Sequence, residues 1–328
     1  MALTLNDFFE GKVTLQYLAK RPKKTFMLES ILPYKSIDAL EYDHVVGKYN
    51  APTTATFAVY GADGRYYGRD GIKKFLEELR PIKAHRTLAG KLLIQYKKYG
   101  AADPLFAQLF DDIGFVYDAV RVRAERMRAE VLTSGQLNVN ENGVVFTVDY
   151  GIPNEHKVVP TVLWNDTTNS NPIQDMIDWK NSIDFEPEGG IISKEIFDYL
   201  SKNVNVRKAI YGDQGASRFV TLEVLNDLLK GLGLPPLAID KEYYRDETGA
   251  KKYFWPSNKF VWVGSNIGQT LMGPTEEGVL GKSVKRTKEG IYIQVHEEER
   301  PPAIITTGSA TSLVALPGAE EIFIATVF

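Results

Sequence analysis

The feature that most constrains this sequence is a long amphipathic run between Asp103 and Gly135. Its apolar side chains recur at steps of three and four residues, the spacing that places them on one face of an α-helix. Asp103 is a candidate N-cap with Pro104 at the first helical position, and Gly135 is a candidate C-terminal stop. The pattern predicts one helix over residues 103–134, roughly 45 Å long at the usual rise per residue. Its apolar face consists of Phe106, Leu109, Phe110, Ile113, Val116, Tyr117, Val120, Ala124, Met127 and Val131.

A helix of this length could form a dimerising coiled coil or pack under a β-sheet. Only about four heptads are present and Gly114 weakens the pattern, so packing under a sheet is favoured. Acidic residues lie in its N-terminal half and arginines in its C-terminal half, an order that suits the helix dipole loosely. These charged residues are Asp111, Asp112, Arg121, Arg123, Arg126 and Arg128.

Composition excludes several classes of chemistry. The chain has 328 residues, enough for about two domains, and contains no cysteine. Disulfides, cysteine-ligated zinc, iron–sulfur clusters and thiol catalysis are therefore excluded. With 39 Lys and Arg against 42 Asp and Glu, the chain lacks the basic excess of a protein that grips nucleic acid. Asp7 interrupts any signal-peptide core and no apolar run is long enough to span a bilayer, so no membrane contact is expected.

The first 45 residues contain only short apolar pieces, which predicts an extended arm with one short helix. A basic cluster, residues 20–24, could contact an acidic partner. A solvated turn beside the end of the helix is the favoured interpretation. Residues 50–71 alternate strand-forming side chains around Asp63-Gly64, a turn pair that supplies positive φ, and predict a β-hairpin.

Glycines in this hairpin precede an amphipathic stretch, residues 72–79, where a helix would begin. Their spacing is not that of a phosphate-binding loop, so a nucleotide site is not favoured. Aromatic and basic side chains occupy the positions between these glycines. They could bind single-stranded nucleic acid by stacking on its bases. The favoured alternative is packing against a neighbouring protein surface. The candidate contact residues are Tyr60, Arg65, Tyr66, Tyr67 and Arg69.

After Gly135 the pattern predicts an α+β arrangement with few long helices. Residues 264–290 are glycine-rich and are predicted to form a loop. Residues 253–264 are predicted to form an aromatic turn followed by a strand. The other predicted strands cover residues 144–148, 158–164, 303–307, 312–316 and 321–328, and the predicted helices cover residues 173–179, 193–203 and 221–231.

No catalytic motif stands out. The chain has four histidines, none of which pairs with another at metal-ligand spacing, and His296 is expected to be solvated in its charged run. Gly281-Lys282-Ser283 resembles the end of a phosphate-binding loop, but Glu276 occupies the position of the required first glycine. No nucleophile elbow occurs. A carboxylate pair of the glycosidase kind stays open because acids are plentiful. We therefore predict no catalytic, cofactor-binding or metal-binding residues.

Several segments carry a resemblance to a known family. Residues 249–264 are similar to its aromatic-Pro-x-Asn segment that leads into a strand and a glycine. Residues 304–308 and 316–328 look like its closing pair of strands, and residues 193–210 look like a helix before its central core. In this order the chain resembles the lambda-type major capsid protein E family of tailed phages, which has the Hong Kong 97 (HK97) fold.

The resemblance implies an α+β HK97-like capsid fold with an N-terminal arm, an extended β-hairpin loop, a long spine helix, and peripheral and axial domains. Residues 1–45 would form the arm, and residues 46–102 the extended hairpin loop and its connection. The peripheral domain would combine residues 103–164, including the spine helix, with residues 301–328. Residues 165–300 would form the axial domain.

The implied function is that of a major capsid protein of a tailed double-stranded DNA phage or prophage. Its copies would form hexamers and pentamers of an icosahedral shell in the virion, assembled in the host cytoplasm. The expected partners are a separately encoded scaffold protein, a portal, a decoration protein and packaged DNA bound without sequence specificity. We expect no enzymatic activity, no cofactor and no large cleavage of the chain. Alternatives are a nanocompartment shell protein and a carbohydrate-acting enzyme.

Overall fold

The computed structural model describes residues 4–46, 73–99, 102–213, 218–246, 248–281 and 284–328. The chain forms two compact units, each assembled from separate stretches of sequence. The first comprises Met1–Tyr42, Leu76–Arg128 and Gln269–Ala315, and the second comprises Asp43–Phe75, Ala129–Gly268 and Leu316–Phe328.

The predicted long helix is confirmed as α5 (Ala102–Ser134). It begins one residue before the predicted start, which places Asp103 in its first turn and not at the N-cap. It stops at Gly135, whose φ of 75° lies in the left-handed region that glycine adopts without strain. Side chains of the predicted face, including Ile113 and Val116, are fully buried.

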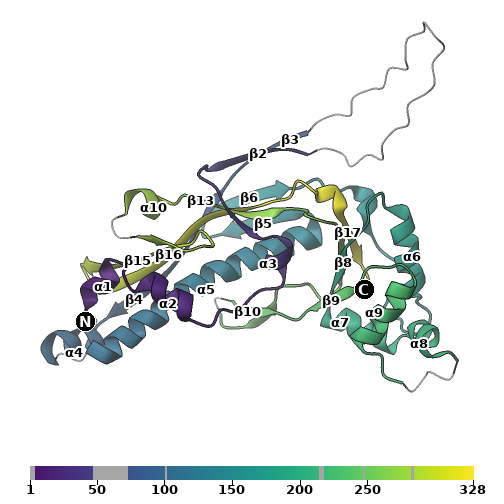
Figure 1. The fold of residues 1–328 in the computed structure, drawn as a ribbon, viewed down its shortest axis with the longest axis horizontal. Coiled ribbons are helices and arrows are strands. Elements are labelled where there is room, and N and C mark those ends of the chain that lie inside the picture. The colour runs from purple at the N-terminus through teal and green to yellow at the C-terminus, as the bar shows by residue number, and fades with distance from the viewer. Residues whose placement is uncertain (1–3, 47–72, 100–101, 214–217, 247, 282–283) are drawn as a thin grey trace, which may run out of the picture. The chain divides into compact units, whose positions relative to one another are not determined.

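The sheet of the first unit is built around β16 (Pro302–Ala315), and Figure 1 shows α5 running alongside it. Two separate strands, residues 303–307 and 312–316, were expected here, and the structure shows one. Gly308 lies where a Cβ atom would stand 2.8 Å from the Val116 carbonyl oxygen of α5. A glycine at this position therefore lets one unbroken strand approach the helix closely.

Strand β4 (Arg80–Ala89) pairs antiparallel with β16 over ten residues, from Ala303↔Ala89 to Ser312↔Arg80. On its other edge β16 pairs with β13 (Gln269–Gly273) and then with β15 (Tyr292–Glu299). The remaining strands of this sheet are β1 (Tyr34–Ser36) and β14 (Lys285–Arg286).

Two sequence expectations fail in this sheet. The predicted loop over residues 264–290 contains the buried strand β13 and the short helix α10 (Glu276–Leu280), because its glycines permit close packing rather than a break. His296, expected to be solvated, is half-buried in β15 opposite Ile305.

The N-terminal residues contain three short helices and not one: α1 (Leu5–Phe9), α2 (Thr14–Lys20) and α3 (Leu28–Ile31). Phe8, Leu18 and Leu28 from these helices are buried, and Phe8 lies 5.3 Å from the ring of Phe106 on α5. The N-terminal segment is therefore part of the core of the first unit.

The predicted hairpin over residues 50–71 lies outside the described residues. On either side of it, β2 (Glu41–Val46) and β3 (Lys73–Glu78) pair with each other. The helix expected over residues 72–79 is wrong, because this stretch pairs as β3. Helix α4 (Lys91–Tyr99) follows β4.

In the second unit, five strands pair in the order β7-β17-β12-β8-β9. Three helices of this unit begin with a side-chain cap, since Asn171, Ser193 and Thr221 each accept a backbone hydrogen bond at a helix start. The strands are β7 (Lys157–Val158), β8 (Gly189–Ser193), β9 (Leu237–Asp240), β12 (Lys259–Val263) and β17 (Ile322–Thr326), and the helices are α6 (Pro172–Ser182), α7 (Lys194–Lys202), α8 (Val204–Tyr211) and α9 (Leu222–Gly231).

Two small antiparallel sheets complete this unit: β5 (Gln136–Glu141) with β6 (Val144–Asp149), and β10 (Tyr243–Arg245) with β11 (Lys251–Tyr253). Two single 3₁₀ turns lie at Asn154–His156 and Ala319–Glu321.

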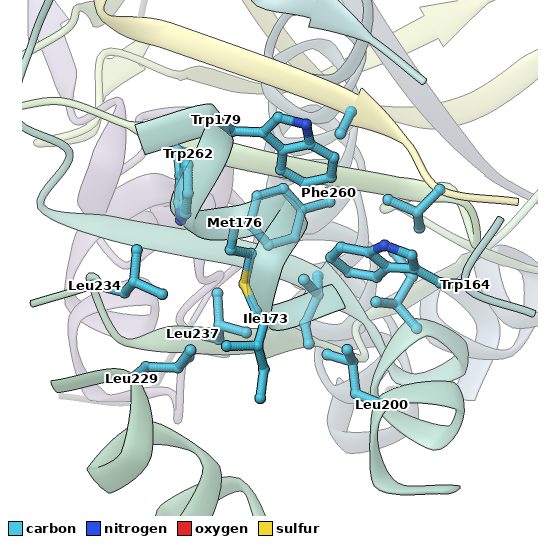
Figure 2. Packing of buried hydrophobic residues seen from close by; sticks show 14 of the residues in the cluster. Trp164, Ile173, Met176, Trp179, Leu200, Leu229, Leu234, Leu237, Phe260 and Trp262 are labelled. Carbon is cyan, nitrogen blue, oxygen red and sulfur yellow. The ribbon is translucent and has the colours of Figure 1, made fainter. Parts of the chain in front are cut away.

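The predicted strand over residues 158–164 is mostly wrong, because only Val158 pairs, in β7, and turns follow. Pro160 cannot donate to a sheet ladder, and Trp164 turns inward. Its indole stacks 5.6 Å from that of Trp179, and its Nε1 donates to Asp175 at 2.7 Å. Figure 2 shows these two rings with Phe260 and Trp262 at the centre of the core.

None of the described helices combines the length and the apolar character needed to cross a bilayer.

We predict that Ile113→Asp unfolds the first unit, because it places an unpaired carboxylate at a fully buried position of α5. Phe115→Asp, two residues along the same helix at a side chain 46% exposed, is the matched control and should leave the fold intact. Circular dichroism and urea unfolding measure both. Equal stability of the two variants would contradict the burial of Ile113.

Candidate functional site

The five predicted contact residues, Tyr60, Arg65, Tyr66, Tyr67 and Arg69, lie outside the described residues, and their role stays a prediction. The structure describes how the two ends of their segment are held. Strands β2 and β3 pair with each other, and the Leu79 amide donates to the Leu40 carbonyl at 2.8 Å. Strand β4 then enters the main sheet, so backbone hydrogen bonds attach both ends of the segment.

The basic cluster over residues 20–24 is bound within the chain. Arg21 forms an ion pair with Asp118 of α5 at 2.6 Å and donates to the Gly114 carbonyl at 3.2 Å. Its hydrogen bond to Asp118 raises the pKa of the guanidinium. Lys23 pairs with Glu289 at 3.0 Å. The expected solvated turn follows α2, with Lys20, Pro22, Lys23 and Lys24 exposed, and its ion pairs from Arg21 and Lys23 hold the N-terminal segment to other parts of the first unit.

A buried ion pair lies on α5 between Glu125 and Arg128, 2.8 Å apart and both completely inaccessible to solvent. Glu125 also accepts the backbone N–H of Leu28 at 2.9 Å. The Nε atom of Arg128 donates to the Leu32 carbonyl at 3.0 Å and to the Thr270 hydroxyl at 2.8 Å. The pair thus joins α5 to the N-terminal segment and to β13.

The sequence analysis interpreted the arginines in the C-terminal half of α5 only as charges that suit the helix dipole. These are Arg121, Arg123, Arg126 and Arg128. A signal for their burial was present, because Arg121, Glu125, Arg128 and Leu132 recur at steps of four, three and four. Arg121 is 3% exposed and pairs with Glu29 at 2.7 Å. The helix therefore has a second buried face, which is polar.

A cavity of about 740 Å³ opens in the second unit between α7, the β10–β11 hairpin and the turn before β12. Four aromatic rings, three lysines and three carboxylates line it, so its formal charge is balanced. Tyr253 at its rim accepts a hydrogen bond from Lys251 at 3.0 Å, which lowers the pKa of the phenol. The lining residues are Ser193, Lys194, Glu195, Asp198, Tyr199, Lys202, Asp240, Tyr244, Lys252, Tyr253, Trp255, Pro256 and Ser257.

Three carboxylates line this cavity: Glu195, Asp198 and Asp240. Its rim carboxylate Asp198 lies 3.9 Å from Lys194. Asp240 lies deeper, is 3% exposed, and accepts the Glu242 amide at 2.8 Å. Across the described ranges, no group of three His, Asp or Glu side chains could hold a metal ion. The arrangement is that of a polar-rimmed aromatic cavity suited to binding.

Large apolar side chains are also exposed on the described surface. Phe219, three residues before α9, is 89% exposed. Leu280 and Val279 on α10 are 82% and 71% exposed, and Val145 on β6 is 73% exposed. Exposed apolar side chains that lie next to one another are typical of surfaces that another protein covers.

Comparison with known proteins gives a consistent result. The family model described as phage major capsid protein E matches residues 20–327. A structure assigned as the capsid protein of an E. coli CFT073 prophage aligns with a TM-score of 0.62 at 15% identity, covering 100% of both chains. A phage-related protein from Bordetella bronchiseptica RB50 aligns with a TM-score of 0.58 at 13% identity, covering 96% of this chain and 95% of that one. No curated protein matches the chain. The predicted α+β HK97-like capsid fold is confirmed.

We predict that Arg128→Met destabilises the protein by about 3–5 kcal/mol, because it leaves Glu125 charged and buried without its partner. Lys194→Ala, which breaks a solvent-exposed pair with Asp198, should cost under about 1 kcal/mol. Urea unfolding measures both. An Arg128→Met variant as stable as Lys194→Ala would show that the buried pair does not hold the N-terminal segment in place.

Proposed function

The chain belongs to the phage major capsid protein E family, and we propose that its copies form pentamers and hexamers of an icosahedral phage or prophage head. The family is one of structural, non-enzymatic proteins, and the protein is a major capsid protein of the virion head. The observation that carries the proposal is the match of the family model from residue 20 to residue 327, almost the entire chain.

We propose the following structural roles for the segments of the subunit. Residues 1–45 act as the arm, whose helices pack against α5 of the same chain, and residues 46–102 act as the extended loop with its connection. Residues 103–164 with 301–328 act as the peripheral domain, and residues 165–300 act as the axial domain, from which β13 and β15 pair with β16. The family membership and the presence of the long helix α5 support this assignment.

The protein assembles with other copies of itself. We propose as further partners a separately encoded scaffold, a portal, a decoration protein and the packaged DNA. The balanced charge of the chain supports contact with DNA without sequence specificity, since strong binding needs many uncompensated cations. The family match favours a phage head over a nanocompartment shell or a carbohydrate-acting enzyme.

Electron microscopy of the purified chain tests the proposed assembly. We expect closed shells or ring-shaped capsomers of five and six subunits, and an oligomer fraction that grows with protein concentration. Analytical ultracentrifugation gives the same result in solution. A monomer at every concentration, with or without a co-expressed scaffold, would contradict the proposal.

Deleting residues 60–70 tests the predicted contact residues. The subunit should stay folded, because the paired strands β2 and β3 on either side of the deletion are retained. Closed-shell formation should be lost. The control replaces residues 60–70 by a Gly/Ser linker of equal length. It distinguishes the effect of shortening the segment from the effect of losing the side chains of Tyr60, Arg65, Tyr66, Tyr67 and Arg69. Normal shells from the deletion variant would refute the assignment.

A further inference from the structure

Two stretches of the sequence carry positive charge without any carboxylate. Residues 11–28 contain five lysines and arginines and no Asp or Glu. Residues 278–288 contain four lysines and arginines and again no Asp or Glu. Because the chain as a whole is nearly neutral, these stretches concentrate its basic side chains locally.

The fold brings the two stretches together in the first unit. Lys23 forms an ion pair with Glu289 at 3.0 Å, across 266 positions of the sequence. Glu289 lies in the turn between β14 and β15, and the Gly290 amide closes this turn by donating to the Thr287 carbonyl at 3.1 Å. The same turn carries Lys288. The ion pair therefore places the cations after α2 beside those of β14 and its turn.

The carboxylates that meet these cations leave a positive excess. Asp118 is paired with Arg21 at 2.6 Å, Glu289 with Lys23 at 3.0 Å, and Asp38 lies 4.0 Å from Arg286. Asp111 on α5 also acts electrostatically on Arg21. Each of the three contacts uses one cation for one carboxylate, and four further lysines outnumber Asp111. These four, which we call the basic strip, are Lys20, Lys24, Lys285 and Lys288.

The composition of the strip indicates the kind of partner that it fits. Lysine and other small or charged residues are depleted at the centre of protein–protein interfaces, where aromatic residues and arginine are enriched. In residues 20–26 and 284–290, all of which the structure describes, no large apolar side chain is exposed. A protein partner would therefore find no apolar anchor on this surface.

A phosphate backbone needs none. The lysine ammonium is a hydrated point charge on a flexible stem, which suits contacts that follow charge and not shape. Each lysine that neutralises a phosphate also releases a condensed counterion, which favours binding at low salt. With no exposed aromatic ring in the two segments to stack on a base, the strip suits the outside of a duplex better than a single strand.

This inference rests on the proposed capsid function: we propose that the basic strip is the surface by which the subunit contacts the phosphate backbone of the enclosed double-stranded DNA. The strip has only four lysines, so each subunit holds the duplex weakly and without reading its sequence. The rest of the nearly neutral surface need not contribute.

A triple variant, Lys20→Gln with Lys24→Gln and Lys288→Gln, tests the proposal at three exposed positions. Fluorescence anisotropy measures binding of the unassembled full chain to a random-sequence duplex of about 30 base pairs, over a series of salt concentrations. We expect the affinity at low salt to fall by about tenfold or more. The slope of log affinity against log salt concentration should decrease by about one unit for each lysine that contacts a phosphate.

The matched control removes the same charge elsewhere. Lys208→Gln with Lys230→Gln and Lys241→Gln changes three exposed lysines of the second unit and should leave both affinity and salt slope close to those of the parent. Both triple variants should keep the unfolding curve of the parent, because every changed side chain is exposed. An equal loss of DNA binding in the two variants would refute the proposal, since only the total charge would then matter.

Poly-L-glutamate is the probe for an acidic protein partner. The parent should bind the duplex more tightly than poly-L-glutamate at the same salt concentration, because phosphates are more closely spaced along DNA than carboxylates are along the peptide. Binding of poly-L-glutamate as tight as that of the duplex, with the same loss in the Lys20/Lys24/Lys288 variant, would assign the strip to an acidic protein and overturn the DNA contact.

The absence of cysteine from the chain allows a second test in assembled shells. Lys24→Cys should react with a small maleimide in closed shells but not with a maleimide on a polymer too large to cross the wall. Reaction with the large reagent would place the strip outside the shell, and no reaction with either would place it under a neighbouring subunit. Both results would overturn the DNA contact while leaving the capsid function intact, whereas failure of the parent chain to assemble would count against the capsid function.

Discussion

The buried guanidinium of Arg128 is the interaction on which the first unit depends. An arginine stays charged at any accessible pH, so its burial needs an opposite charge and hydrogen-bond acceptors close to it. Glu125 compensates its charge, and the Leu32 carbonyl and the Thr270 hydroxyl accept from its Nε. These contacts join segments separated by 96 and 142 residues in the chain. Parallel pairing of Tyr34 with Thr270 starts β1 directly beside this point.

A close helix–sheet approach is the second constraint on the same unit. Strand β16 passes α5 where Gly308 faces the Val116 backbone, and a Cβ atom there would overlap with it. Small polar side chains on the same strand, such as Thr306 and Ser309, are also buried. The close contact of α5 and β16 thus rests on small residues in the strand as much as on large apolar residues in the helix.

The chemistry of the subunit surface suits a protein that assembles with copies of itself. Nearly balanced charge limits electrostatic repulsion between identical copies. The second unit has a complete aromatic core around Trp164, Trp179 and Trp262, so it does not need Phe219 for its own folding.

The sequence alone determined the features whose signal is local. Residue periodicity predicted α5, and short segments, most of them near the C-terminus, indicated the capsid family. The five contact candidates between Tyr60 and Arg69 are still untested. Only the tertiary structure decided which distant segments meet: β4 against β16, Arg128 against Leu32 and Thr270, and the walls of the aromatic cavity. The reason is physical, since helical periodicity and capping depend on neighbours within a few residues, whereas a glycine's close approach or a buried charge depends on atoms supplied by remote parts of the chain.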